Sequence, residues 1–225
     1  CAQNTLELPK GCKENYFTTS DKVKIRYVTA GKGTALILIP GWTMPAEVFE
    51  NQLEHFSKTN LVIAVDPRAQ GKSEKTTEGL YFKREAQDIS ELTQHLGLNA
   101  YYLIGWSWAG PMICSYLKHF DAPAFKGAVI VDGPIQFTKS FTDLIINMTK
   151  AILEDRKAFT PIFIKGLFVQ PQSEAYLEKL SKASLMTPTS AAVTLLANCL
   201  VYSDKEWIEG IKATSKPLLF YVAEG

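Results

Sequence analysis

Five short runs of apolar residues constrain the fold of this chain more than any other feature. Each run is continuous rather than alternating, which is the pattern of parallel strands that are covered on both faces. The runs occupy residues 35–39, 61–65, 101–104, 128–131 and 218–222. Residues 23–28 alternate apolar and polar side chains after the turn-forming residues 19–22, so an antiparallel hairpin is predicted ahead of the parallel strands.

Segments with helical spacing of apolar residues separate several of these runs. They cover residues 48–56, 86–96 and 112–120, and strands alternating with helices predict a mostly parallel α/β sheet with right-handed crossovers and helices on both faces. From about residue 135 to 215 the strand pattern stops, within what is expected to be a single domain, residues 1–225. This mostly helical stretch is predicted to be an inserted lid, and it carries Phe137, Phe141, Phe159, Phe163 and Phe168.

The charge balance and the cysteines argue against several classes of function. Lysine and arginine number 24 against 23 aspartates and glutamates, with no basic block, which argues against a nucleic-acid partner. No apolar run reaches the ~18 residues that a membrane span needs. The four cysteines lack C-x-x-C or Cys/His metal spacing, so no metal site is predicted.

The first residues, Cys1-Ala2-Gln3-Asn4, resemble the start of a processed bacterial lipoprotein. Export with a lipid anchor at Cys1 is therefore as consistent with the sequence as a cytoplasmic location. A bridge between Cys1 and Cys12 is expected only in the exported case. The sequence gives no indication of the oligomeric state.

A serine between a strand-like run and a helical run carries the clearest chemical signal. Residues 105–110, Gly-Trp-Ser-Trp-Ala-Gly, follow the apolar run at 101–104 and precede an amphipathic run. In so tight a turn the side chains two positions before and after Ser107 would collide, and here they are the small Gly105 and Ala109. The motif predicts a nucleophile elbow and points to acyl transfer or ester hydrolysis.

Four signatures in a fixed order together resemble the α/β-hydrolase fold family, over the chain from about residue 16 to its end. They are residues 39–42, where Pro40 replaces the family's usual histidine; residues 66–73, similar to Asp-x-Arg-Gly-x-Gly-x-Ser but with Ala69 for the first glycine; the elbow; and residues 131–134. The chain most resembles small lidded serine esterases and cofactor-free haloperoxidase-like or perhydrolase-like hydrolases. The resemblance implies a lid, a small-molecule ester substrate and no cofactor.

Other groups of the family fit less well. A tryptophan directly after the nucleophile is also similar to proline iminopeptidases, yet their His-Gly-Gly-Pro-Gly loop is absent. Epoxide hydrolases and haloalkane dehalogenases use an aspartate nucleophile, whereas the elbow here holds Ser107.

The resemblance implies roles for particular residues. Ser107 is the expected nucleophile, and the backbone N–H groups of Trp42 and Trp108 are the expected oxyanion-hole donors. Losing one such donor typically costs ~3 kcal/mol of transition-state stabilisation. The side chains of Trp42, Trp106 and Trp108 either pack in the core or narrow and desolvate the site.

The order along the chain in this fold is serine, acid, histidine. The acid normally follows the strand predicted at residues 218–222, so the triad histidine, together with a last strand and helix, is expected beyond Gly225. Asp132, at the end of an earlier strand, is a candidate for a displaced acid, although an acidic residue there also forms turns. Glu224 is a weaker candidate.

Geometry speaks against each histidine of the sequence as the base. His119 lies 12 residues after Ser107, about 18 Å along the same predicted helix. His95 precedes the strand that delivers Ser107, which places it at the opposite end of the sheet, ~15 Å away. His55 precedes the strand at 61–65 and lies at the wrong end for the same reason.

Two classes of function remain. The first is a serine hydrolase that cleaves small carboxylic esters through an acyl-enzyme on Ser107, with perhydrolysis as a side activity. The second is a non-catalytic module that holds a small apolar ligand under the same phenylalanine-rich lid. A phosphate-binding loop at 66–73 is disfavoured, because no glycine stands five residues before Gly71. That loop is predicted to be structural support.

Overall fold

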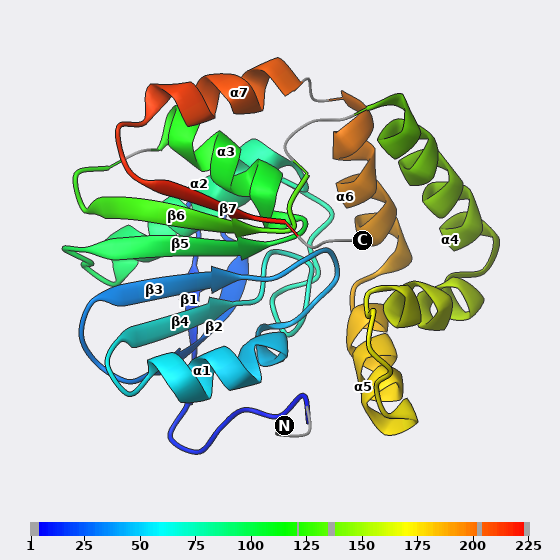
Figure 1. Ribbon diagram of the computed structural model, residues 1–225, viewed down its shortest axis with the longest axis horizontal. Helices are drawn as coiled ribbons and strands as arrows, with labels where there is room; N and C mark the ends of the chain where they lie inside the picture. Colours follow the sequence, from blue (N-terminus) through cyan, green and yellow to red (C-terminus); the bar gives the residue numbers. More distant parts are fainter. Residues whose placement is uncertain (1–4, 121, 135–137, 202–203, 223–225) are drawn as a thin grey trace.

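The computed structural model describes residues 5–120, 122–134, 138–201 and 204–222, which form one seven-stranded sheet surrounded by helices (Figure 1). The expectations for Cys1 and Glu224 therefore lie outside the described residues. Across the sheet the strands lie in the order β1-β2-β4-β3-β5-β6-β7. Their bounds are β1 (Lys13–Thr18), β2 (Lys24–Ala30), β3 (Ala35–Ile39), β4 (Leu61–Val65), β5 (Tyr101–Trp106), β6 (Phe125–Val131) and β7 (Leu218–Tyr221).

Strand pairing follows the predicted division between an antiparallel start and a parallel centre. β1 pairs antiparallel with β2, and β2 antiparallel with β4, whereas the remaining pairs among the described strands are parallel. The hairpin and the mostly parallel sheet are thus confirmed. β3 lies between β4 and β5, and its consecutive residues Ile37, Leu38 and Ile39 are all buried. Helices cover both faces here, which is why the run is continuously apolar.

Helices occupy both faces of the sheet. The 3-10 turn η1 (Ala46–Phe49) and α1 (Glu50–Phe56) pack on one face, and α2 (Phe82–His95) and α3 (Ala109–His119) on the other. Beyond the carboxyl ends of the parallel strands lie α4 (Lys139–Gly166), α5 (Glu174–Leu185) and α6 (Thr189–Val201) (Figure 1). We refer to α4, α5 and α6 as the cap.

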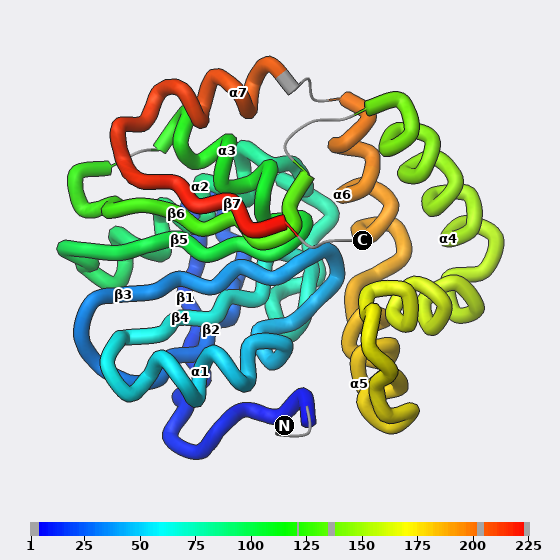
Figure 2. The backbone as a smooth tube through the Cα atoms, in the orientation of Figure 1, coloured from blue at the N-terminus to red at the C-terminus, as the bar shows by residue number. Residues whose placement is uncertain are grey.

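The stretch predicted as one inserted lid divides into two parts. The cap helices lie beyond the sheet, whereas α7 (Asp204–Ala213) returns to pack along α3, as the tube in Figure 2 shows. Gly210 permits this contact, because a Cβ there would lie 2.2 Å from the carbonyl oxygen of Cys114. α7 therefore belongs to the layer beside the sheet and leads directly into β7.

α4 is two helical segments joined at Asp155, whose backbone is extended (φ −153°, ψ 96°). The Asp155 carboxylate accepts hydrogen bonds from the backbone N–H groups of Lys157 (2.9 Å) and Ala158 (3.0 Å), and so caps the second segment. Thr138 caps the first segment in the same way, through Phe141 N–H. The break lets α4 turn and enclose the end of the sheet.

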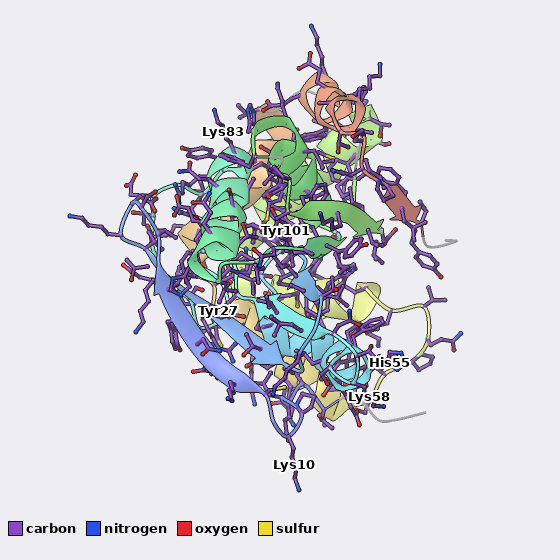
Figure 3. The ribbon with its side chains drawn as sticks, turned by 90° about the vertical axis from the view of Figure 1, so that its left-hand side faces the viewer. Lys10, Tyr27, His55, Lys58, Lys83 and Tyr101 are labelled. Carbon is purple, nitrogen blue, oxygen red and sulfur yellow. The ribbon has the colours of Figure 1, made fainter. Side chains whose placement is uncertain are left out.

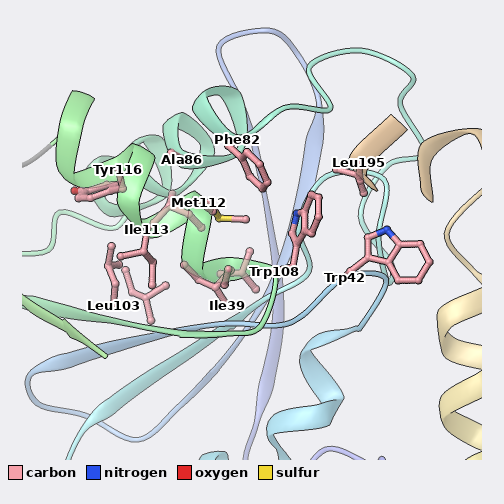
Figure 4. Packing of buried hydrophobic residues seen from close by; sticks show 14 of the residues in the cluster. Ile39, Trp42, Phe82, Ala86, Leu103, Trp108, Met112, Ile113, Tyr116 and Leu195 are labelled. Carbon is pink, nitrogen blue, oxygen red and sulfur yellow. The ribbon is translucent and has the colours of Figure 1, made fainter. Parts of the chain in front are cut away.

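The main core lies between the sheet and α2 and α3. Figure 4 shows Leu103 of β5 below Ile113 and Tyr116 of α3, and Phe82 of α2 close to Trp108. Among the described residues no single helix is long and apolar enough to cross a membrane, although α5 and α6, bent by 87° at their break, meet that criterion as a pair.

Candidate active site

The turn between β5 and α3 holds Ser107 in a strained conformation. Its φ is 52°, a left-handed value that is unusual for a residue with a Cβ. Ser107 N–H donates to the carbonyl oxygen of Val131 (2.8 Å), and the Ser107 carbonyl accepts from Gly110 N–H (2.9 Å). The neighbouring strand and the first turn of α3 thus hold the strained residue in place, as in a nucleophile elbow.

Small residues are required around the elbow, as the sequence motif predicts. A Cβ at Gly105 would lie 2.6 Å from Ile113 Cδ1 and 2.7 Å from Ala109 Cβ. On the other side, a Cβ at Gly41 would approach Ser107 Cβ to 3.3 Å. The turn can therefore close only because these positions carry little or no side chain.

Ser107 opens into an apolar cavity of about 380 Å³ between the sheet and the cap. Its lining includes the nucleophile, oxyanion-hole and acid candidates from the sequence, namely Ser107, Trp42, Trp108 and Asp132. Its other lining residues are mostly apolar and come largely from the cap: Gly133, Pro134, Phe141, Leu144, Ile145, Met148, Phe163, Leu167, Leu196 and Val222. The volume and lining suit a small, mostly apolar molecule.

Asp132 follows β6 and lines the same cavity as Ser107. Its φ is 49°, and its N–H donates to the carbonyl oxygen of Tyr221 in β7 (2.7 Å). This bond and the one from Ser107 N–H to Val131 bring the ends of three adjacent strands together. Asp132 therefore stands in a turn at a strand end and lines the same cavity as Ser107.

Trp42 and Trp108 flank Ser107 and are buried. The Trp42 indole N–H donates to the Ala192 carbonyl oxygen in α6 (3.0 Å), which ties the loop after β3 to the cap. The Trp108 ring packs on Phe82, with 4.8 Å between ring centroids (Figure 4). Their side chains thus do the packing that the sequence suggested, while their backbones stand beside the serine.

Trp106 does not help to line the Ser107 cavity. It lines a second cavity, of about 770 Å³, on the opposite face of the sheet. The expectation that three tryptophans narrow one site is therefore wrong for Trp106, because successive strand residues point to opposite faces. The described lining of this larger cavity contains no serine, cysteine, histidine or carboxylate. Although this cavity is larger than the Ser107 cavity, its described lining offers none of the members of a catalytic triad.

All three histidines lie in the described part of the chain, and none lines the Ser107 cavity. His95 stacks on Phe17, with ring centroids 5.6 Å apart. His119 Nε2 lies 3.1 Å from Glu206 Oε1 of α7. His55 lies in the last turn of α1 at the edge of the molecule, near Lys58 (Figure 3). The described residues also contain no group of three or more metal-ligating side chains.

The loop at residues 66–73 has the predicted supporting role. Buried Asp66 accepts hydrogen bonds from Arg26 Nη1 (2.9 Å), Ala46 N–H (2.6 Å) and Lys72 N–H (2.6 Å). Arg68 binds both carboxylate oxygens of Asp88 at 2.7 Å. Ala69 has a φ of 61°, so it adopts the backbone that the glycine of the family pattern accommodates without strain.

The comparisons with known sequences agree with this geometry. A sequence model of the family described as alpha/beta hydrolase fold matches residues 34–224. Soluble epoxide hydrolase of Corynebacterium sp. (strain C12) is 37% identical over 109 residues, which are 48% of this chain and 38% of that protein. Non-heme chloroperoxidase of Streptomyces lividans is 32% identical over 130 residues, 56% of this chain and 47% of that protein. The chain spans less than half the length of these curated relatives.

Solved structures share the arrangement at lower identity. A bromoperoxidase from Bacillus anthracis superposes with a TM-score of 0.85 at 19% identity, covering 92% of this chain and 80% of that one. An esterase from Exiguobacterium antarcticum has a TM-score of 0.84, with the same identity and coverage. With the family match extending over most of the sequence, the chain belongs to the α/β-hydrolase fold family.

Proposed function

We propose that this chain carries the nucleophile of a serine hydrolase that cleaves small carboxylic esters. The observation that carries the proposal is the strained elbow serine, Ser107, which opens into a mostly apolar cavity of about 380 Å³. Strain at a residue held by its neighbours is typical of functional positions. A cavity of this size and lining favours a small acyl or alcohol group over a long chain.

The proposed route is acyl transfer through Ser107. The hydroxyl oxygen attacks the ester carbonyl carbon while a base takes its proton, the alcohol leaves with that proton, and water then releases the acid. Backbone N–H groups of Trp42 and Trp108 stabilise the oxyanion, each contributing about 3 kcal/mol. Asp132, beside Ser107 in the cavity lining, is the proposed acid that orients the base.

The route requires a histidine base, which the described site lacks. None of the three histidines of this sequence lines the cavity, so the proposal needs a histidine outside these 225 residues. The relatives support hydrolase chemistry in general, since they include an epoxide hydrolase and an esterase as well as haloperoxidases. A serine at the elbow favours ester cleavage within that range, with perhydrolysis as a side activity.

The decisive experiment is labelling of the full-length protein with a fluorophosphonate, which reacts with activated serines. We expect labelling of the wild type, none of Ser107→Ala, and wild-type labelling of Ser140→Ala, which removes an exposed hydroxyl on α4. Hydrolysis of p-nitrophenyl acetate should follow the same pattern. A wild type that does not label, or that labels equally as Ser107→Ala, would overturn the proposal.

A non-catalytic binding module is the second candidate, favoured by the lack of a histidine in the cavity lining. This alternative predicts that short-chain aliphatic ligands raise the melting temperature of the protein while p-nitrophenyl acetate is not turned over. Replacing Leu196 of the cavity lining by Gln would then weaken ligand binding, whereas Ser107→Ala would leave it unchanged.

A further inference from the structure

Arg156, on the second segment of α4, carries a buried positive charge at the boundary between cap and sheet domain. It is 7% exposed. Its Cζ lies 4.9 Å from the centroid of the Trp42 ring. Its Nη2 donates to the Ser184 carbonyl oxygen (3.3 Å) and to Ser184 Oγ (3.4 Å), and both bonds are long. Nε and Nη1 have no hydrogen-bond partner among the described residues.

Further buried polar groups extend from Arg156 across the boundary. Ser184 Oγ lies 2.7 Å from Thr43 Oγ1, and Thr43 N–H donates to Gln70 Oε1. Gln70 is fully buried, and within the described part of the chain its amide Nε2 has no hydrogen-bond partner. The same holds for the buried Thr187 hydroxyl, three residues after Ser184. We refer to Arg156, Ser184, Thr187, Thr43 and Gln70 as the Arg156 cluster.

The Arg156 cluster lacks an acceptor rather than a donor. Three of its unpartnered atoms are nitrogens that only donate: Nε and Nη1 of Arg156, and Nε2 of Gln70. No carboxylate in the described part of the chain lies within 4.0 Å of the guanidinium. Burial lowers the pKa of Arg156 to about 10, with no charged partner opposing it, so the group is still cationic at neutral pH.

The tryptophan beneath Arg156 offsets only part of the cost of burying this charge. The attraction of a cation for an aromatic ring is weaker than the free-energy cost of burying an unpaired ion. A small anion would supply both the missing charge and the missing acceptor atoms. Hydrogen bonds between a guanidinium and a carboxylate are short and strong compared with those between neutral groups.

We propose that the Arg156 cluster is a binding site for a small carboxylate, held between the cap and the loops after β3 and β4. The two oxygens of one carboxylate supply the acceptors that the N–H groups of Arg156 and Gln70 lack, and its single negative charge balances a single guanidinium. Trp42 lies between this site and the Ser107 cavity, because it contacts Arg156 and lines that cavity. The site is independent of the proposed function, since binding there requires no turnover.

The test is thermal unfolding of the full-length protein in sodium formate or acetate, with ionic strength held constant by sodium gluconate, whose anion is larger. We expect a saturable rise in melting temperature of about 2–4 °C for the wild type at several times Kd. Arg156→Met should abolish the rise. Lys157→Met, which removes the next and exposed charge of α4, should retain it.

An equal rise in Arg156→Met, or no rise in the wild type, would overturn the proposal; in the second case water alone satisfies the cluster. Line broadening of 13C-formate by the wild type, reversed by acetate, tests binding even where Arg156→Met does not fold. Gln70→Met provides a second variant and should weaken formate binding by about tenfold, the loss of one hydrogen bond.

The carboxylate could be free or part of a substrate, and a further arm separates these sources. Monomethyl succinate carries a carboxylate and an ester on one short chain. If monomethyl succinate raises the melting temperature at concentrations tenfold lower than acetate requires, the site binds a carboxylate of the substrate. If acetate is as effective, the site takes free carboxylates. Both results require Arg156 and support the site.

Discussion

Two sets of buried arginines show opposite ways of placing a charge in the interior. Arg26 and Arg68 have fully buried side chains and pair with carboxylates at 2.7–3.1 Å. Arg156 is almost as buried, yet pairs with none among the described residues. The paired arginines fix the loops below the site. The unpaired one keeps hydrogen-bonding capacity, and this difference separates supporting structure from a candidate binding site.

Glu85 in α2 shows a third way of burying an ionisable group. It is buried, and no described residue lies in hydrogen-bond geometry with either carboxylate oxygen. Burial, followed by the negative charge of Asp88, raises the pKa of Glu85 to about 8, although the charge of Arg68 and the nearby Trp108 indole N–H oppose the rise. On α6, Cys199 faces the same carboxyl group, and its own pKa is raised by burial and by Glu85. Glu85 therefore stays protonated at neutral pH, where Asp88 is paired and charged.

The largest effect on stability is expected from breaking the paired set. Arg68→Met removes two hydrogen bonds from a guanidinium to the buried Asp88 carboxylate, which keeps Arg84 as its other partner, and should lower the free energy of unfolding by about 3–5 kcal/mol. Urea denaturation measures this change. Lys83→Met, on the exposed face of α2, should stay within about 0.5 kcal/mol of the wild type. A loss below about 1 kcal/mol in Arg68→Met would mean that the pairing does not support the loop.

An intermediate effect, dependent on pH, is expected at Glu85. In the folded protein Glu85 holds its proton up to pH about 8, whereas an ordinary glutamate holds it only up to pH 4.5. The contribution of Glu85 to the free energy of unfolding is therefore complete below pH 4.5 and declines as the pH rises towards 8. Between these values the free energy of unfolding falls by about 1.4 kcal/mol per pH unit. Glu85→Gln, which mimics the protonated form, should gain about 2–3 kcal/mol on the wild type between pH ~5 and ~7.

Urea midpoints of wild type and Glu85→Gln across this pH range check the prediction. Glu78→Gln, at an exposed carboxylate, should follow the wild type at every pH. A constant difference between Glu85→Gln and the wild type would show that Glu85 is ionised in the folded state.

The smallest effect is expected from removing the unpaired charge. In a buffer without small carboxylates, Arg156→Met should change the free energy of unfolding by less than about 1 kcal/mol, because it removes an uncompensated buried charge and keeps an apolar side chain on Trp42. Urea denaturation beside Arg68→Met makes the comparison direct. A loss of unfolding free energy as large as that of Arg68→Met would show that the protein contacts of Arg156 stabilise its charge. Arg156 would then not differ from the paired arginines.

Sequence patterns predicted the parts of the fold that are encoded locally. The continuous apolar runs correspond to β3 to β7, and the small residues around Ser107 correspond to an elbow with a left-handed serine. The division between the cap and α7 was not predictable in this way. An apolar helix face does not indicate whether its partner is another cap helix or α3.

Two residues show where local reasoning ended. Trp106 adjoins Ser107 in sequence, but the strand directs its side chain to the other face of the sheet. Arg156 was not singled out, although a signal existed: it stands at helical spacing with the buried residues Thr160 and Ile164 in the second segment of α4. A charge at such a position requires a partner, and the sequence alone does not identify one.

The sequence by itself determined the order of the strands along the chain and the presentation of Ser107, because both depend on neighbouring residues and on spacing. The resemblance of its motifs to a known family indicated the α/β-hydrolase fold. Only the tertiary structure placed Asp132, Trp42, Phe141 and Phe163 around one cavity, and linked Gln70 to Arg156 through Thr43 and Ser184. These contacts join segments far apart in the chain. They exist because the sheet brings strand ends together and the broken helix α4 turns back over them.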